Sequence, residues 1–359
     1  MRTFHTCRTR RARGRQTWLR WTLALAVTLG LLLGCGGQRE IRITGRTMGT
    51  TYHVTIIGGY FTSVGQLRQA IDERLEAINA SMSTYRPESE ISRFNALPAT
   101  GTTFSVGDDF FQVVRLSREL FEMTAGAWDG TIDPLVDLWG FGRTQRTPRI
   151  PTDREIHDRM AHVGFDLIDA SREGFLIKRH PKVTLDLASV AKGYGVDVVA
   201  ALIRARGFTD FLVEVGGEVF AAGVRLDGRQ WRIGINRPEA GAAIDQVYQV
   251  VRLRDRAFAT SGDYRIFFDQ DGKRFSHVLD PRTGRPVANG VVSVSVTAAT
   301  CARADGLATA LMVMGVDEGL KLVDALADVE CLMVVRDTEG NLVDHYSKNF
   351  KRYTAEAGQ

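Results

Sequence analysis

Hydrophobic residues along the chain recur with two different periods, and each period predicts a different element. Spacings of three or four residues in segments 64–82 and 108–125 predict amphipathic helices. Segments 189–206 and 302–314 have the same helical spacing, and Gly207 and Gly315 follow them as suitable end residues. These four expected helices are spread from the first part of the chain to the last.

Alternation of apolar and polar residues predicts strands in much of the remainder. Segment 41–57 alternates on both sides of a break at Met48-Gly49-Thr50-Thr51, which indicates a strand pair or a bulged strand. Asp227-Gly228 and Asp271-Gly272 favour the left-handed turns of hairpins. Strands in hairpin pairs between separated helices favour an α+β fold with antiparallel sheets over a doubly wound parallel sheet. Further strands are expected at residues 183–187, 211–215, 219–224, 231–235, 247–253, 257–261, 291–297, 330–336 and 342–346.

One expected hairpin carries a histidine near its end. Its first arm is residues 264–268, and its second arm begins at Phe275. Because side chains alternate along a strand, Phe275, His277 and Leu279 would share one face, just before a turn at Asp280. Strand ends commonly present chemistry, although a strand histidine is also often an ordinary core or surface residue.

A carboxylate and a hydroxyl follow on the next predicted helix. Asp305 and Thr309 are spaced i, i+4, which puts both oxygens on one helix face. Such a pair suits a hard cation such as Mg²⁺. The alternative is that Asp305 merely interacts with the helix dipole from the first turn.

Two earlier stretches have unusual local chemistry. Tyr85 lies on a turn bounded by Pro87, directly after a predicted helix. Ala127-Trp128-Asp129 belongs to the Gly- and Trp-rich segment 126–142, which has neither a helical nor a strand period. A segment of this composition is typical of a loop that lines a ligand or a domain junction.

A further acidic and basic pair lies around residue 189. Asp186 lies near the end of a predicted strand, Ser189 begins a helix, and Lys192 lies in its first turn. A stackable aromatic ring, acids and a Mg²⁺-type pair together suit a nucleotide-like cofactor. No P-loop and no Gly-x-Gly-x-x-Gly motif occurs in the right context, so the common nucleotide-binding folds are not supported.

The composition is that of an ordinary globular protein. The chain has 359 residues, of which 25% are charged and 44% hydrophobic, and a net charge of +4. Residues 1–34 hold seven Arg and no acid, which leaves 39 basic and 42 acidic residues in the rest. Without that segment the chain is mildly acidic, so no nucleic-acid-binding surface is expected.

The basic N-terminal segment has the pattern of a targeting signal. Its arginines precede an apolar run, residues 22–33, that is short for a membrane span. The run closes with Leu32-Leu33-Gly34-Cys35, which looks like a bacterial lipobox in which Cys35 is acylated and becomes the N-terminus. An uncleaved N-terminal anchor is the alternative.

These features predict four parts of the chain. They are a lipoprotein signal peptide at residues 1–34, a tether at 35–40, one large domain at 41–350 and a tail at 351–359. After processing, Cys301 and Cys331 are the only possible disulfide pair, and the sequence does not decide whether they meet.

Several long motifs in the domain form a specific pattern. In order they read MGTTY, MSTYRPESEISRFN, GAWDGTIDPLVDLWGFG, DLASVAKGYGVD, VEVGGEV, ATSGDYR, SHVLDPRTGRPV and ADGLATALMVMG. Together they resemble the ApbE-type flavin transferases (FAD:protein FMN transferases), from Met48 to about Met314. Two departures are small: Trp128 stands where Phe is more usual, and Gly130 where Pro is common.

The resemblance implies a fold and a set of contacts. The fold would be the α+β ApbE-like (T-fold-like) fold, with antiparallel sheets, packed helices and two lobes around the flavin site. Mg²⁺ would be held by Asp305, Thr309 and an oxygen of Ser189. Tyr85 would pack on a ring of FAD, although such a Tyr can also be an ordinary half-buried aromatic and Lys192 can simply face solvent. The implied FAD contacts are Met48, Tyr85, Ala127, Trp128, Asp129, Asp186, Lys192 and Leu279.

The resemblance also implies a reaction. A Thr or Ser hydroxyl on a target protein would attack the FMN-side phosphorus of FAD and release AMP, with Mg²⁺ neutralising the pyrophosphate. His277 is the candidate base, because its ordinary pKa is near neutrality. The expected targets are flavoprotein subunits of membrane redox complexes, met at the periplasmic side of the inner membrane by a lipid-anchored enzyme. A Mg²⁺-dependent FAD pyrophosphatase and a non-enzymatic flavin-binding lipoprotein remain as alternatives.

Overall fold

The computed structural model describes residues 37–354, except residues 99, 143–146, 240, 243–245 and 264–265. The predicted signal peptide, Cys35, and residues 355–359 of the predicted tail lie outside the described residues.

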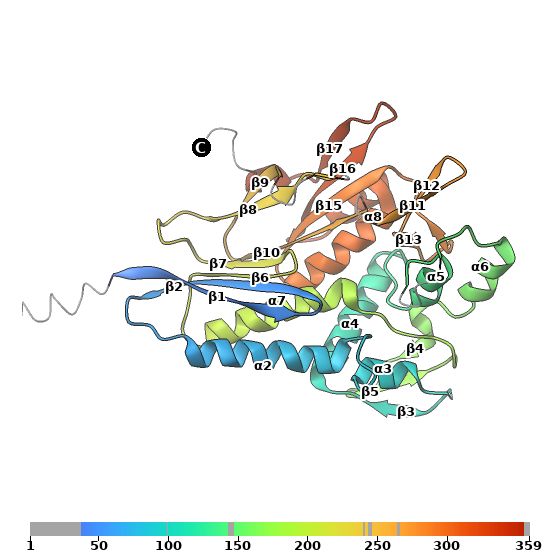
Figure 1. Ribbon diagram of the computed structural model, residues 1–359, viewed down its shortest axis with the longest axis horizontal. Helices are drawn as coiled ribbons and strands as arrows, with labels where there is room; N and C mark the ends of the chain where they lie inside the picture. Colours follow the sequence, from blue (N-terminus) through green and yellow to red (C-terminus); the bar gives the residue numbers. More distant parts are fainter. Residues whose placement is uncertain are drawn as a thin grey trace, which may run out of the picture.

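An antiparallel sheet forms the centre of the fold (Figure 1). In the described part of the chain it has eight strands, in the order β1-β2-β6-β7-β10-β15-β16-β17. Each neighbouring pair runs antiparallel, which confirms the expected α+β fold with antiparallel sheets. The strands are β1 (Gln38–Thr47), β2 (Thr50–Gly59), β6 (Phe211–Val215), β7 (Glu218–Ala222), β10 (Arg256–Gly262), β15 (Val291–Ala298), β16 (Glu330–Arg336) and β17 (Leu342–Tyr346).

Both faces of this sheet are covered, because successive side chains point to opposite sides. Ile56 packs under the helices, whereas its neighbour Ile57 packs on the other face. The helical face carries α2 (Gly65–Met82), α7 (Ala188–Ala205) and α8 (Cys301–Ala325). The opposite face carries the ribbon of β8 (Trp231–Asn236) and β9 (Val247–Leu253) and the short helix η2 (Phe350–Tyr353). The sheet is therefore a middle layer, and its strand β15 is buried along its whole length.

Smaller elements surround the end of the sheet where α7 begins. Helix α4 (Asp108–Met123) packs on α8 and α7. A separate small hydrophobic core joins α5 and α6 to two hairpins through Leu135, Trp139, Ile156 and Leu279. The remaining elements are α3 (Glu90–Asn95), β3 (Thr103–Ser105), α5 (Asp133–Leu138), α6 (Asp153–Met160), η1 (Phe165–Leu167), β4 (Ile168–Asp169), β5 (Phe175–Lys178), β11 (Phe267–Gln270), β12 (Lys273–Ser276), β13 (Leu279–Asp280) and β14 (Arg285–Pro286).

The strand expected at residues 183–187 is wrong, although its burial pattern is right. Val183, Leu185 and Leu187 are buried, but the segment has no strand partner. The side chain of Asn95 takes that place: its Oδ1 accepts from Leu185 N at 2.7 Å and its Nδ2 donates to Leu185 O at 2.8 Å. One amide side chain thus satisfies the backbone that a neighbouring strand would otherwise pair.

The hairpin expected across Asp227-Gly228 is also wrong. Strand β7 pairs with β6 and β10 in the large sheet, whereas β8 pairs with β9 on the opposite face. The indole of Trp231 packs under the sheet and donates to Ala222 O at 2.8 Å, so burial of this ring draws β8 out of the sheet plane. Segment 126–142 is not wholly a loop, because it contains the one-and-a-half-turn helix α5.

The predicted helix end at Gly315 is confirmed. Gly315 interrupts α8 with φ 77° and ψ −177°, so two helices meet there. Cys301 and Cys331 are both buried free thiols. Among the described residues, none of the helices has the length and apolar composition needed to cross a membrane.

Candidate active site

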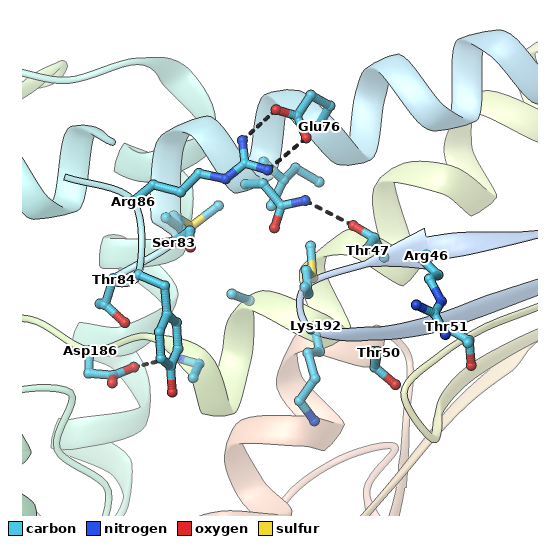
Figure 2. A pocket seen from close by; sticks show the side chains of 18 residues that line it. Arg46, Thr47, Thr50, Thr51, Glu76, Ser83, Thr84, Arg86, Asp186 and Lys192 are labelled. Carbon is cyan, nitrogen blue, oxygen red and sulfur yellow. Dashed lines mark hydrogen bonds and ion pairs between the residues drawn. The ribbon is translucent and has the colours of Figure 1, made fainter. Parts of the chain in front are cut away.

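A cleft of about 830 Å³ opens where the β1–β2 turn faces the end of α2 and the start of α7 (Figure 2). It is lined by residues 46–51, 76, 78, 79, 82–86, 186, 188, 191 and 192. Four of the predicted FAD-contact residues, Met48, Tyr85, Asp186 and Lys192, come together here from segments far apart in the chain. Its size suits a ligand of cofactor dimensions.

The turn that presents Met48 is a tight left-handed one. Met48 has φ 49° and Gly49 has φ 72°, as the two-residue turn between twisted antiparallel strands requires. A non-glycine residue seldom adopts such a φ. The conformation directs the thioether toward α7, where its Cε would lie 3.0 Å from a Cβ placed on Gly195. Met48 therefore fills the gap between the turn and the helix that bears Lys192.

Tyr85 is presented to solvent by a braced turn. Its side chain is 82% exposed, although it is a large hydrophobic residue. The next residue, Arg86, pairs with Glu76 of α2 on the wall of the cleft (Figure 2). Ser89 Oγ donates to Ser83 O at 2.7 Å and closes the same turn. An exposed ring on a fixed backbone offers a flat face to a ring of a ligand.

Lys192 does not simply face solvent. Its Nζ lies 2.5 Å from Oε1 of Glu218, which is buried at the start of β7. Burial lowers the pKa of Lys192, but the negative charges of Asp305 and Glu218 outweigh it and raise this pKa above its ordinary value. The ammonium is therefore charged at the floor of the cleft, where it can meet an anionic ligand.

Asp305 lies behind Lys192 in the protein interior. Only 3% of this residue is exposed, and its Oδ2 accepts from the backbone N–H of Gly193 at 3.1 Å. Burial raises the pKa of Asp305 to about 8, against the opposing effect of Lys192. A second cation nearby would stabilise the ionised form of this buried carboxyl group and lower its pKa.

Ala127, Trp128 and Asp129 are buried beside the site and do not line the cleft. The indole Nε1 of Trp128 donates to Ser189 Oγ at 3.0 Å, so this ring fixes the first turn of α7. Asp129 Oδ1 accepts from the N–H and hydroxyl of Thr131, at 2.8 and 2.7 Å. Burial raises the pKa of Asp129 to about 6. The structure thus buries all three residues outside the cleft, and Trp128 is the one that contacts α7.

The two unusual residues of this segment match each other. A Cβ on Gly130 would lie 3.0 Å from Trp128 Cη2 and 3.0 Å from Leu187 Cδ2. The indole occupies the room that a larger residue at position 130 would need. Trp128 and Gly130 therefore form a compensating pair.

His277 and Leu279 do not lie on one strand face as expected. Strand β12 ends at Ser276, and Leu279 belongs to the separate pair β13–β14, where it is buried in the small core. Neither residue lines the cleft. His277 Nδ1 lies 3.0 Å from Ile266 O, and burial lowers the pKa of His277. The ring is thus neutral near pH 7, with Nδ1–H donating to the carbonyl and Nε2 left as the basic nitrogen.

Comparisons with known proteins agree on one family. The ApbE family profile matches residues 48–333. The chain belongs to the ApbE family. A Vibrio cholerae relative named FAD:protein FMN transferase is 42% identical over 337 residues, which cover 93% of this chain and 98% of the relative. A relative of the same name from Haemophilus influenzae is 37% identical over 92% of this chain and 96% of its own length.

Solved ApbE structures have the same fold. The flavin transferase ApbE from Vibrio cholerae matches with a TM-score of 0.80 and 40% identity, over 88% of this chain and 99% of that one. The apo flavinyl transferase ApbE from Pseudomonas stutzeri matches with a TM-score of 0.79 and 35% identity, over 88% and 97%.

The residues expected to hold Mg²⁺ in this ApbE protein have suitable chemistry. Asp305 and Thr309 lie four residues apart on α8. The backbone N–H of Gly193 donates to Asp305 and so joins it to the turn of α7 that begins near Ser189. In a regular helix the Gly193 N–H donates to the carbonyl of Ser189. Because this N–H also donates to Asp305, the Ser189 carbonyl has capacity for a further contact, such as one with Mg²⁺. Among the described residues no three His, Cys, Asp or Glu side chains gather as a metal site. One carboxylate with neutral oxygens still suits Mg²⁺, which keeps water and substrate phosphate as ligands.

Sequence reasoning missed two residues that shape this site. Glu218 follows Gly216-Gly217 and pairs with Lys192. An acid among apolar strand residues was the signal in the sequence that could have identified it. Asp197 of α7 accepts from the N–H groups of Cys301 and Ala302, at 2.7 and 2.9 Å. It caps α8 from another helix, and the spacing of residues along the chain carries no signal for that contact.

Proposed function

We propose that this protein transfers the FMN part of FAD to a Thr or Ser hydroxyl of a target flavoprotein and releases AMP. The observation that carries the proposal is the convergence of Tyr85, Asp186 and Lys192 around one cleft, with Asp305 directly behind Lys192. The relatives that match nearly the whole chain are named for this reaction.

The residues of the cleft have complementary roles in this proposal. Tyr85 offers a ring face for stacking, Asp186 offers acceptors for the polar groups of FAD, and the Lys192 ammonium offsets pyrophosphate charge. Asp305, Thr309 and Ser189 would hold Mg²⁺, which supplies further charge neutralisation at the phosphates. Trp128 keeps Ser189 in place through its indole N–H.

His277 is the proposed base. The target hydroxyl forms a bond to the FMN-side phosphorus, its proton passes to Nε2 of His277, and the phosphorus–oxygen bond to AMP breaks. The contact of Nδ1 with Ile266 O supports the tautomer that this step needs. In the free protein His277 lies outside the cleft lining, so the proposal requires FAD or the target to extend toward β12.

The setting of the reaction is also a proposal. Acylation of Cys35 would anchor the protein to the inner membrane on its periplasmic side, and the targets would be flavoprotein subunits of membrane redox complexes. The lipobox pattern at residues 32–35 supports this setting.

An acceptor-dependence experiment tests the reaction. The protein is incubated with FAD, Mg²⁺ and a candidate acceptor, and the intact mass of the acceptor is measured. We expect one added FMN on the acceptor and none on its Thr→Ala variant. AMP release alone decides nothing, because a pyrophosphatase also releases AMP. Fast FMN release without acceptor, and no labelled acceptor at any time, would establish the pyrophosphatase instead.

A further inference from the structure

Two large aromatic side chains stand exposed next to each other at the turn between β2 and α2. Phe61 is 93% exposed and Tyr60 is 62% exposed, and their rings meet edge to face with centroids 5.4 Å apart. Among the described residues, Tyr85 in the cleft is the other aromatic side chain with such exposure, at 82%. Single exposed apolar residues are normal, but an adjacent exposed pair marks a contact surface.

The position of this pair points to what it contacts. Tyr60 N donates to Gly37 O at 3.0 Å, so the aromatic turn is tied to the first described residue. Figure 1 shows the start of β1 and the turn before α2 at the same end of the molecule. Gly37 follows Cys35 by two residues, which span at most about 7 Å. A lipid on Cys35 would therefore bring a bilayer to within about 10 Å of the Tyr60 backbone, from which both rings project.

The charge beside the rings suits a phospholipid surface. The guanidinium of Arg39 lies over the Tyr60 ring, 5.5 Å from its centroid, and Arg39 is exposed. Aromatic rings are enriched at the headgroup level of membranes, where their apolar body and polar rim both find partners. A cation near an anionic leaflet is attracted to it.

We propose that Arg39, Tyr60 and Phe61 form a membrane-contact patch that seats among the lipid headgroups beside the acylated N-terminus. The patch rests on the proposed anchor at Cys35 and is independent of the flavin chemistry. It gives the anchored protein a defined orientation, because three points of contact fix a body that one point leaves free to rotate.

This orientation places the cleft away from the bilayer. The β1–β2 hairpin has ten residues in each strand, which is about 30 Å in length, and its far end is the Met48 turn in the cleft. Helix α2 has 18 residues, about 27 Å, and runs in parallel from the patch to the cleft wall. The flavin site would therefore lie about 30 Å from the headgroups when these elements stand upright.

Fluorescence quenching by lipids tests the patch. The full-length acylated protein is placed in phosphatidylglycerol-containing vesicles with brominated acyl chains, after intact mass has confirmed the lipid on Cys35. The native tryptophans of the described domain, Trp128, Trp139 and Trp231, are buried, so an added surface tryptophan can be followed above them. Phe61→Trp is the reporter. Val343→Trp is the matched control, because Val343 is exposed on β17 at the other edge of the sheet.

We expect brominated lipid to quench at least half of the added Phe61→Trp signal and to leave the Val343→Trp signal unchanged. Equal quenching of the two reporters, or none in vesicle-bound protein, would overturn the patch. Concentration-dependent dimerisation that protects only the Phe61→Trp reporter would assign the surface to a second copy and would also overturn it. An unacylated Cys35 removes the membrane contact, while FMN transfer to an acceptor in solution would remain.

Discussion

The backbone N–H of Gly193 in α7 donates to the carboxylate of Asp305 in α8 across a contact that only glycine allows. A Cβ on Gly193 would lie 2.4 Å from Cys301 O, which is rigid backbone of α8. The two helices therefore approach closely enough for a main-chain donor of α7 to reach a buried side chain of α8. Lys192, the residue before Gly193, interacts electrostatically with the same carboxylate.

Replacing Gly193 by Ala should push these helices apart. We expect a loss of about 1–3 kcal/mol in the free energy of unfolding, as for other overpacked interiors. Urea unfolding followed by circular dichroism measures this loss. Gly65→Ala is the control, since nothing lies within 4 Å of a Cβ at Gly65, at the start of α2. Equal stability of the Gly193 variant and the wild type would contradict the close contact.

Replacing Asp305 by Asn tests the proposed Mg²⁺ site. The change keeps the size of the side chain and an acceptor for Gly193 N–H, but it removes the charge. We expect FMN transfer to fall on the order of a hundredfold or more, as loss of major electrostatic stabilisation does. FAD binding, measured by fluorescence, should persist through the cleft residues. Unchanged activity with unchanged Mg²⁺ dependence would refute the assignment.

His277 should determine the acid limb of the pH–rate profile. Burial lowers the pKa of His277 below its ordinary value of 6.5, so the ring loses its proton at lower pH than a free histidine. We expect the transfer rate to rise with pH through a midpoint below pH 6.5 and then to level off. His277→Ala should bind FAD and transfer little, without this limb. Full transfer by the variant would leave the reaction in place and move the base role to Asp186.

The Trp128–Gly130 match predicts a non-additive pair of substitutions. Gly130→Ala should destabilise the wild type by about 1 kcal/mol or more, because its Cβ meets Trp128 and Leu187 at 3.0 Å. In a Trp128→Phe background Cη2 is absent, and the same change should cost less. A double-mutant cycle of unfolding free energies measures the coupling. Additive effects would show that the two residues are not matched.

Replacing Cys35 by Ala tests the proposed anchor. If Cys35 is acylated, the variant should leave the membrane fraction or accumulate unprocessed. Fractionation and intact mass distinguish these results from the wild type. The same membrane attachment and mass in both proteins would rule the anchor out. FMN transfer to an acceptor in solution should be unaffected.

Local patterns predicted most of the elements, because the periods of hydrophobic residues are set by the faces that the elements bury. The helix at α2 and the turn at Met48-Gly49 were predictable for that reason. The segment at residues 183–187 was not, since its partner is a side chain 90 residues earlier in the chain. The sequence marked Glu218 as an unusual acid, but it did not show the pairing of Glu218 with Lys192, because that contact joins a helix to a strand through the fold.

In the site, too, local motifs identified residues, whereas contacts between distant segments could not be predicted. Motifs gave Tyr85, Asp186 and Lys192, which the structure gathers in one cleft. They did not distinguish residues that line the cleft from those that pack beneath it, such as Trp128. The alternation argument failed at His277, because β12 ends one residue before it.

Helix α8, which carries Asp305, has no side-chain cap of its own at its N-terminus. Thr300 makes no side-chain cap, and the oxygens that take up the first N–H groups belong to Asp197, 104 residues before Cys301. In a chain emerging from synthesis, these first N–H groups therefore gain their partner only when α7 has docked against α8. Closing so long a loop is slow compared with forming a helix, and its entropy must be offset before the contact forms. The residues proposed to hold Mg²⁺ around Asp305 would thus come together late in folding, so a partly folded chain with both helices present would lack the proposed site.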